Sequence, residues 1–225
     1  FTVGGRRVET RLLVRHADGG WAGYPYVWNE AGTDAVLARA GAEVDGWSVP
    51  STPQCLQCHV VAPTGSPLGG TLGLSVQQLD VDYVFDSGWT ENQLDLWVRL
   101  GWLATAPARP GPYPALDDAS APLDVRARTY LEVNCAICHV EGGPGGGSLD
   151  LRASVSLADT AACDPPEVTD LGVAGARVIT PGDPARALRM HRRDSAGMPP
   201  IASDTVDTAG AALIDAWITA LTACP

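Results

Sequence analysis

The chain has 225 residues, a hydrophobic content of 45% and a formal net charge of -11, and its 15 cationic side chains are all Arg. Such an acidic chain does not favour nucleic acid or anionic lipid as a partner, because both attract basic surfaces. No segment approaches the roughly 18 consecutive apolar residues of a membrane helix, so no direct membrane span is predicted. The length suggests two small domains.

The first predicted element is a β-hairpin. Its strands are Glu9–Arg15 and Trp21–Trp28, and Asp18-Gly19-Gly20 between them has the residue types of a tight turn. A helix is predicted over 33–42 from its composition and its flanking turn residues.

The middle of the chain is expected to be less regular. Pro50 and Pro53 predict that the chain is extended where it enters a first cysteine motif. A helix is predicted from about Thr90, which would cap it, with apolar residues on one face. Residues 105–121 are rich in Pro and are predicted to be a linker between two domains.

The C-terminal part predicts two helices around a glycine-rich loop. The first helix would be capped by Asp124 and lead into a second cysteine motif, and the loop spans 142–147. The last helix would be capped by Asp204, and its apolar stripe is expected to pack against the helix before Cys135. That stripe comprises Val206, Leu213, Trp217 and Leu221.

Two identical patterns carry the chemistry. Cys55-Leu56-Gln57-Cys58-His59, the first pentad, and Cys135-Ala136-Ile137-Cys138-His139, the second pentad, both read C-x-x-C-H. This is the signal for covalent attachment of c-type haem. Cysteines three apart lie on the same side of a helical turn, so each sulfur can bond the porphyrin edge while the adjacent His ligates iron. Two haem c groups are therefore expected.

Three other interpretations of the cysteine pairs are less favoured. A redox dithiol of the thioredoxin type would need a βαβ pattern nearby, which neither pair has. A four-cysteine zinc site would leave both following histidines as a coincidence. A disulfide within each pair would close a very short loop.

The second half resembles class I cytochrome c. The resemblance rests on the order of helix, pentad, glycine-rich loop, Met198-Pro199-Pro200 and closing helix. The whole chain resembles a poorly characterised group of dihaem cytochromes. The implied fold is mainly α, with an N-terminal hairpin extension (1–44), a cytochrome c-like haem domain (45–104), the linker (105–121) and a class I-like domain (122–225).

The resemblance also implies a compartment. Haem c is attached outside the cytoplasmic membrane, so a periplasmic or extracellular protein is expected. The lack of an initiator Met at Phe1 fits either a processed exported protein or a segment of a longer precursor. That compartment permits disulfides, so Cys163 and Cys224 are expected to pair; two separate thiols are the alternative.

The sixth iron ligands follow by elimination. Without Lys, the strong ligands other than the pentad histidines are His16, Met190, His191 and Met198. The place of Met198 resembles that of the distal Met in class I cytochromes, and a thioether suits iron(II), so Met198 is expected to ligate haem 2, the haem of the second pentad. For haem 1, the haem of the first pentad, His16 is the first choice. Met190, His191 or a vacant position are the alternatives.

Several aromatic and basic residues are candidates for the haem surroundings. Trp89, Trp97 and Trp102 are expected to line haem 1, because flat side chains suit a flat apolar cofactor. The cationic cluster Arg189, Arg192 and Arg193 either pairs with haem propionates or is simply solvated.

Single-electron transfer is the predicted function. The protein would act between a donor and an acceptor protein, as a soluble carrier or as a subunit of a larger membrane-associated redox complex. Catalysis is not expected. The alternative is a dihaem peroxidase or a sulfur-compound oxidoreductase, which would use an open or weakly ligated haem 1.

Overall fold

The computed structural model describes residues 1–59, 72, 74–165, 175, 177–185, 187, 198 and 206–225. Of its residues, 26% are helical and 20% lie in strands of several small sheets. The predicted mainly α fold of two helical haem domains is therefore wrong, and the fold is mixed α and β. Within the described ranges, no helix is long and apolar enough to cross a membrane.

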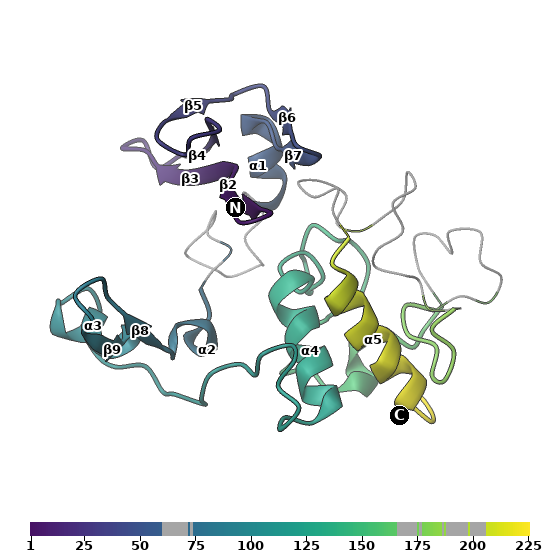
Figure 1. The fold of residues 1–225 in the computed structure, drawn as a ribbon. Coiled ribbons are helices and arrows are strands. Elements are labelled where there is room, and N and C mark those ends of the chain that lie inside the picture. Colours follow the sequence, from purple (N-terminus) through teal and green to yellow (C-terminus); the bar gives the residue numbers. More distant parts are fainter. Residues whose placement is uncertain are drawn as a thin grey trace.

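The N-terminal hairpin is confirmed. After the short pair β1 (Thr2–Val3) and β2 (Arg6–Arg7), strand β3 (Glu9–Arg15) pairs antiparallel with β4 (Trp21–Trp28). A third strand, β5 (Ala35–Leu37), continues the sheet on the far side of β4 (Figure 1).

The helix predicted over 33–42 does not form. β5 lies in that range, and β6 (Ala42–Val44) begins at its end and pairs with β7 (Trp47–Val49). Val36 lies opposite Val27 in the sheet, so pairing with β4 overrides a helical composition. Tertiary contacts commonly override such weak local preferences.

Gly41 lies between β5 and β6, where the backbone approaches the residues that lead to the first pentad. It has φ +81°, and a Cβ there would lie 2.7 Å from the carbonyl oxygen of Val49. Gly46, in the turn between β6 and β7, has a similar φ of +74° but nothing within 4 Å. The two glycines therefore differ in available space rather than in backbone conformation.

We expect Gly41→Ala to lower the free energy of unfolding by at least about 1 kcal/mol more than Gly46→Ala. Both variants carry the strain of a left-handed non-glycine residue, and only Gly41→Ala also pushes backbone apart. Urea unfolding of the two variants beside the parent chain measures the difference. Equal losses would show that Gly41 is not held against Val49.

The next elements form a small lobe. It contains α2 (Val76–Leu79), the strand pair β8 (Asp82–Val84) and β9 (Thr90–Asn92), and α3 (Gln93–Arg99). The helix predicted from Thr90 thus begins three residues later. Its cap is Asn92, whose side-chain oxygen accepts from the Leu94 N–H at 3.0 Å, because Thr90 is engaged in β9.

Residues 105–121 contain neither helix nor strand, as predicted for a linker. Ion pairs and hydrogen bonds join them to the small lobe before them and to the helix after them. Arg109 pairs with Asp80 and Asp95 of the small lobe. The Tyr113 hydroxyl donates to Glu132 of the following helix at 2.6 Å, and its backbone N–H donates to the Gln77 carbonyl.

The second half is built on two helices and a 3-10 turn. Helix α4 (Leu123–Asn134) packs against α5 (Thr208–Ala220), as predicted, and η1 (Leu157–Thr160) lies between them in the chain. Figure 1 shows α4 and α5 side by side. The main buried cluster fills this half, with Leu131, Leu151, Ile179 and Trp217 each at most 3% exposed.

The predicted helix caps differ from those in the structure. Asp124 lies in the first turn of α4, and the N-cap position is occupied by Pro122 without a side-chain hydrogen bond. Helix α5 is capped by Asp207, whose carboxylate accepts from the Gly210 N–H at 2.9 Å. Asp204 lies outside the described residues.

The predicted disulfide is present. Cys163 and Cys224 are bonded, and 61 positions separate them in the sequence. The bond joins the segment after η1 to the chain end beyond α5, so it closes the second half around its helices.

Candidate haem attachment site

The first pentad lies on α1 (Thr52–His59). The chain reaches it from β7, so the extended approach is confirmed. Pro53 fits the first turn of the helix, where its missing N–H is not needed. The Gln54 side chain accepts from the Ser51 N–H at 2.8 Å, which satisfies one of the donors that a helix start leaves unpaired.

The helix brings the two cysteines of the first pentad to one side. Cys55 and Cys58 are three residues apart, and His59 is the last residue of the helix. Helix α1 packs on β4. A Cβ added to Gly23 would lie 2.5 Å from the Cys55 Cβ and 2.6 Å from its Sγ. The sheet can therefore approach Cys55 this closely only with glycine at position 23.

We expect Gly23→Ala to lower the free energy of unfolding by about 1–3 kcal/mol, because the added methyl group pushes α1 from the sheet. Gly20→Ala is the matched control in the same hairpin. A Cβ there would meet only the flexible Asp18 side chain, at 3.2 Å, so its effect should stay within about 0.5 kcal/mol. Urea unfolding measures both, and two equal small effects would contradict this packing of α1.

A buried ionic group lies beside the first pentad, and the sequence analysis missed it. Glu9 is 0% exposed. Its carboxylate accepts hydrogen bonds from Arg11, at 2.6 and 2.8 Å, and from the Trp47 indole at 2.8 Å. Glu9 and Arg11 are two apart on one strand and so share its face. That spacing was the available signal, but the contact of the buried Glu9 with Trp47 depends on the placement of β7.

Burial and the Arg11 charge act on the pKa of Cys55 in opposite directions. Burial raises the pKa of the Cys55 thiol, and the nearby Arg11 charge lowers it; Glu9 raises it further. The net effect is upward. Cys55 is therefore a protonated thiol at neutral pH.

The second pentad forms a turn directly after α4. The Cys135 N–H still donates to the Leu131 carbonyl at 2.8 Å. The N–H groups of Cys138 and His139 both donate to the Cys135 carbonyl, at 3.0 and 2.9 Å. This single hydrogen-bonded turn holds the two cysteines on one side. Cys135 packs against the main core of the second half.

The glycine-rich loop closes over His139. The Gly145 N–H donates to the Cys138 carbonyl at 2.9 Å, and a Cβ on Gly145 would lie 2.7 Å from His139 Nδ1. The loop thus needs glycine at position 145, because its backbone lies directly against the His139 imidazole. His139 Nδ1 is buried and has no hydrogen-bond partner. Burial also lowers the pKa of His139, which favours the neutral imidazole that ligates metals.

None of the four pentad cysteines is part of a disulfide. Burial is the largest cause that raises the pKa of Cys135 and Cys138 to about 11. Redox dithiols and reactive nucleophiles have lowered values instead. Among the described residues, no three His, Cys, Asp or Glu side chains are grouped as a metal site would require. The raised pKa values disfavour a reactive dithiol.

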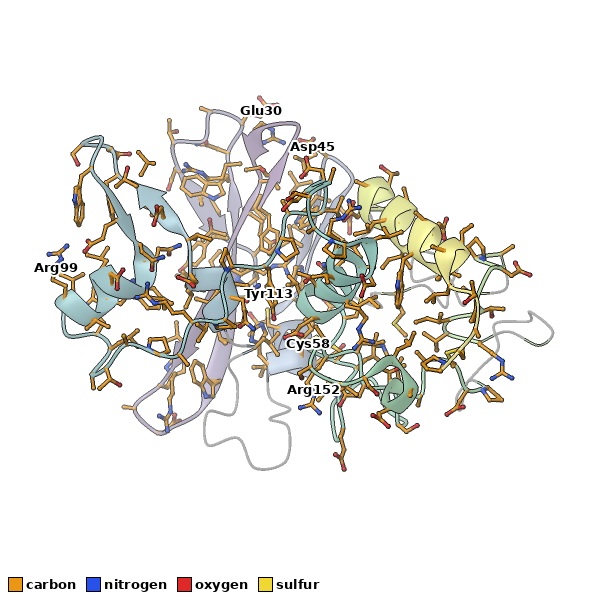
Figure 2. All side chains as sticks on the ribbon, turned by 90° about the horizontal axis from the view of Figure 1, so that it is seen from below. Glu30, Asp45, Cys58, Arg99, Tyr113 and Arg152 are labelled. Carbon is orange, nitrogen blue, oxygen red and sulfur yellow. A yellow bond between two sulfur atoms is a disulfide. The ribbon has the colours of Figure 1, made fainter. Side chains whose placement is uncertain are left out.

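The two pentads meet in space. After burial, the nearby Cys58 side chain is the next cause that raises the pKa of Cys138, so the two cysteines lie close together. Figure 2 shows Cys58 where α1 borders the second half of the chain, and in Figure 1 α1 lies next to the turns at the upper end of α4. No sequence pattern indicates that these two residues lie close together, since 80 positions separate them.

His16, the expected sixth ligand of haem 1, lies at the hairpin turn. Its Nε2 is hydrogen-bonded to the Tyr24 hydroxyl at 2.8 Å. Neighbouring strand residues point to opposite faces, so Tyr24 belongs to the face away from Gly23 and α1. The structure therefore holds His16 on the side of the sheet opposite Cys55.

The other candidate ligands belong to the second half. Met198 is 46% exposed. Met190 and His191 lie outside the described residues, as do Arg189, Arg192 and Arg193. The structure does not test their expected roles.

The tryptophans expected around haem 1 lie in the small lobe. Trp89 is 45% exposed and stacks on Phe85, and Trp102 is 70% exposed, 6.2 Å between ring centroids from Trp97. Their apolar surface is available to a ligand or a partner.

Both pentads fit a covalently attached haem. In each, two thiols outside any disulfide lie one turn apart on one side of the backbone, with a histidine directly after them. At the second pentad the Nδ1 atom of the imidazole is buried and has no hydrogen-bond partner. No protein-family model matches the chain, and no curated protein or solved structure is significantly similar to it.

Proposed function

We propose that this chain is an exported dihaem c-type cytochrome that transfers single electrons between redox proteins. The observation that carries the proposal is the pair of C-x-x-C-H pentads, each on a helical turn with neither thiol in a disulfide. Two such sequences in one chain, both in a conformation suited to attachment, would be an unusual coincidence for any other site.

Four cysteines would form the covalent links. Cys55 and Cys58 would hold haem 1 through thioether bonds, and Cys135 and Cys138 would hold haem 2. The haem groups would supply the redox chemistry, since iron alternates between its ferrous and ferric states. The protein would position them and set their potentials through ligands and burial.

The histidines would complete the attachment. His59 and His139 would each provide an imidazole ligand to iron. Gly145 lets the loop close over the His139 ring and restricts its rotation. This positioning resembles the way outer-sphere groups orient metal-binding histidines in other sites.

The sixth ligands remain part of the proposal. Met198 is proposed for haem 2, whose reduction potential a thioether would raise. For haem 1, His16 would have to leave its hydrogen bond to Tyr24 and reach the other side of the sheet. Spectra of the oxidised His16→Ala variant test this assignment: an unchanged low-spin signal excludes His16.

The acidic surface fits a protein partner better than nucleic acid or anionic lipid. With a net charge of -11, the chain would be steered toward a basic redox protein, and the association should weaken as salt rises. The partner would be a donor or acceptor protein, free or within a membrane-associated complex. Periplasmic or extracellular location follows from the proposed haem attachment.

The decisive experiment expresses the chain with an export signal in a bacterium that has haem c maturation machinery. Intact-mass analysis after denaturation should show a mass increase of two haem groups, and pyridine haemochrome spectra should report thioether-linked haem. Neither should change on treatment with a chelator. A colourless protein, or one whose metal a chelator removes, would refute the proposal and favour a zinc site.

A further inference from the structure

One face of the N-terminal sheet is open to solvent. Helix α1 packs on the face that includes Gly23. Side chains alternate between the two faces of a strand, so Leu12 and Val14 lie on the other face, where Leu12 is 47% exposed and Val14 38% exposed. The large side chains of this outer face are Leu12, Val14, Tyr24, Tyr26 and Trp28. The outer face is thus an apolar, largely aromatic surface that α1 leaves uncovered.

Two cations lie over the aromatic rings of the outer face. The guanidinium carbon of Arg7 is 4.4 Å from the centroid of the Trp28 ring, and that of Arg39 is 5.5 Å from the centroid of the Tyr24 ring. Both arginines are exposed, and neither forms an ion pair with a described residue. The outer face therefore carries two positive charges that are not paired with a carboxylate of the described chain.

The β8–β9 hairpin of the small lobe also exposes aromatic side chains. Tyr83 is 52% exposed and Trp89 45% exposed, and their ring centroids lie 4.9 and 4.8 Å from that of Phe85, which contacts both. Val84 of the same hairpin is 64% exposed. Contiguous exposed apolar groups are typical of interaction sites, and Tyr and Trp are enriched at such sites. The hairpin is therefore suited to docking.

The charge of this hairpin is opposite to that of the outer face. Residues 76–99 contain five acidic side chains and one basic side chain. Three of these carboxylates are already paired: those of Asp80, Glu91 and Asp95, with Arg99 and Arg109 as partners. Asp82 and Asp86 are exposed and form no ion pair within the described part of the chain. Two unpaired negative charges thus lie next to Tyr83 and Phe85.

We infer that the β8–β9 hairpin of one copy of this chain docks on the outer face of the N-terminal sheet of a second copy. A second copy fits because each surface offers exposed apolar groups and two unpaired charges, and the two pairs of charges have opposite signs. Contact would remove apolar area of both surfaces from water. It would also bring Asp82 and Asp86 toward Arg7 and Arg39. Figure 1 shows the sheet and the hairpin in separate parts of the molecule, so one chain presents both surfaces at once.

Two different surfaces on one chain allow two kinds of assembly. Two copies can close the contact reciprocally, with each hairpin on the sheet of the other copy, or further copies can add head to tail. In both cases the mass of the particle rises with protein concentration. The contact uses neither pentad, so it does not depend on the proposed function.

Sedimentation velocity of the full chain, over a wide range of concentration, tests the contact. The parent chain should associate as its concentration rises and dissociate as salt screens the charge pairs. Replacement of the exposed Tyr83 by Ser should raise the dissociation constant at least about ten-fold, as for aromatic side chains at the centre of other interfaces.

Two charge-reversal variants test which surfaces meet. The sheet variant carries Arg7→Glu and Arg39→Glu, and the lobe variant carries Asp82→Arg and Asp86→Arg. In each variant alone, like charges would face each other across the contact. Each should therefore stay monomeric where the parent chain associates, with a dissociation constant raised at least about a hundred-fold.

An equimolar mixture of the two variants should associate again. The acidic lobe of the sheet variant then meets the basic sheet of the lobe variant, and the acidic sheet of the former meets the basic lobe of the latter. Mixing cannot repair a misfolded chain, so restored association separates a surface effect from damage to the fold. General attraction is not the cause, because both variants stay acidic in a chain whose parent has a net charge of -11.

The matched control has the charge change of the lobe variant on the second half of the chain. Asp117→Arg with Asp215→Arg replaces two exposed carboxylates that form no ion pair with a described residue. This control should associate like the parent chain. Equal weakening in the control and the lobe variant would show that net charge, rather than the hairpin, determines association.

Every other outcome also decides. A parent chain that is monomeric at all concentrations would overturn the inference and leave the hairpin to a basic protein of another kind. Association that persists in either variant alone, or a mixture that stays monomeric, would overturn it as well. The readout is mass, so a monomeric chain with two covalent haem groups supports the cytochrome and refutes the contact. An associating chain without haem does the reverse.

Discussion

Replacement of Cys135 and Cys138 by alanine should leave one covalently bound haem per chain, half the content of the parent protein. The same result is expected for replacement of Cys55 and Cys58. Each pair would provide both thioether links of its haem, and the two remaining cysteines are not available, because Cys163 and Cys224 are joined in the disulfide. Intact mass and haem absorbance per chain measure the effect.

The two variants should differ in stability. Cys135 packs against the main core and Cys55 against a small sheet, so loss of the second haem should destabilise its half more strongly. The matched control replaces Cys163 and Cys224 by alanine and should retain both haem groups. A pentad variant that still binds two covalent haem groups would contradict the assignment of the cysteines.

The Cys163→Ala, Cys224→Ala variant should itself lose about 4 kcal/mol of unfolding free energy. The estimate follows from the 61-position separation of the two cysteines and the chain entropy that the crosslink removes from the unfolded state. Such a loss is a large part of the stability of an ordinary domain. Guanidinium unfolding of the variant, compared with the parent protein, measures it.

Reduction provides an independent check of the same bond. Thioether links are not cleaved by thiol reductants, so a reductant should destabilise the parent protein by a similar amount and leave its covalent haem content unchanged. The reductant should have no effect on the variant. A loss below about 1 kcal/mol in both experiments would show that the disulfide contributes little to the second half.

Local patterns predicted the elements that depend on nearby residues. The hairpin formed as expected because its strands and turn are adjacent in the chain and specify each other. The closing helix also formed, and Leu213 and Trp217 of its predicted stripe are buried. Its cap was placed three residues early, because Asp204 and Asp207 are equally suitable by type.

The errors concern segments whose conformation depends on a distant partner. Residues 33–42 have helical composition, yet β5 forms within them because it pairs with the edge of β4. Residues 90–92 form β9 because β8 lies opposite them. Together with β1–β2 and β6–β7, these short antiparallel pairings turned a predicted mainly α fold into a mixed one.

By itself, the sequence determined the chemistry of the chain: two pentads that predict covalent haem, and two remaining cysteines that proved to be bonded. Only the tertiary structure decided the fold class, the close approach of Gly23 to Cys55 and the meeting of Cys58 with Cys138. The physical reason is the sequence separation of the residues involved. The predicted haem attachment depends on five consecutive residues. The contacts, in contrast, join side chains tens of positions apart, and their energies depend on how the whole chain packs.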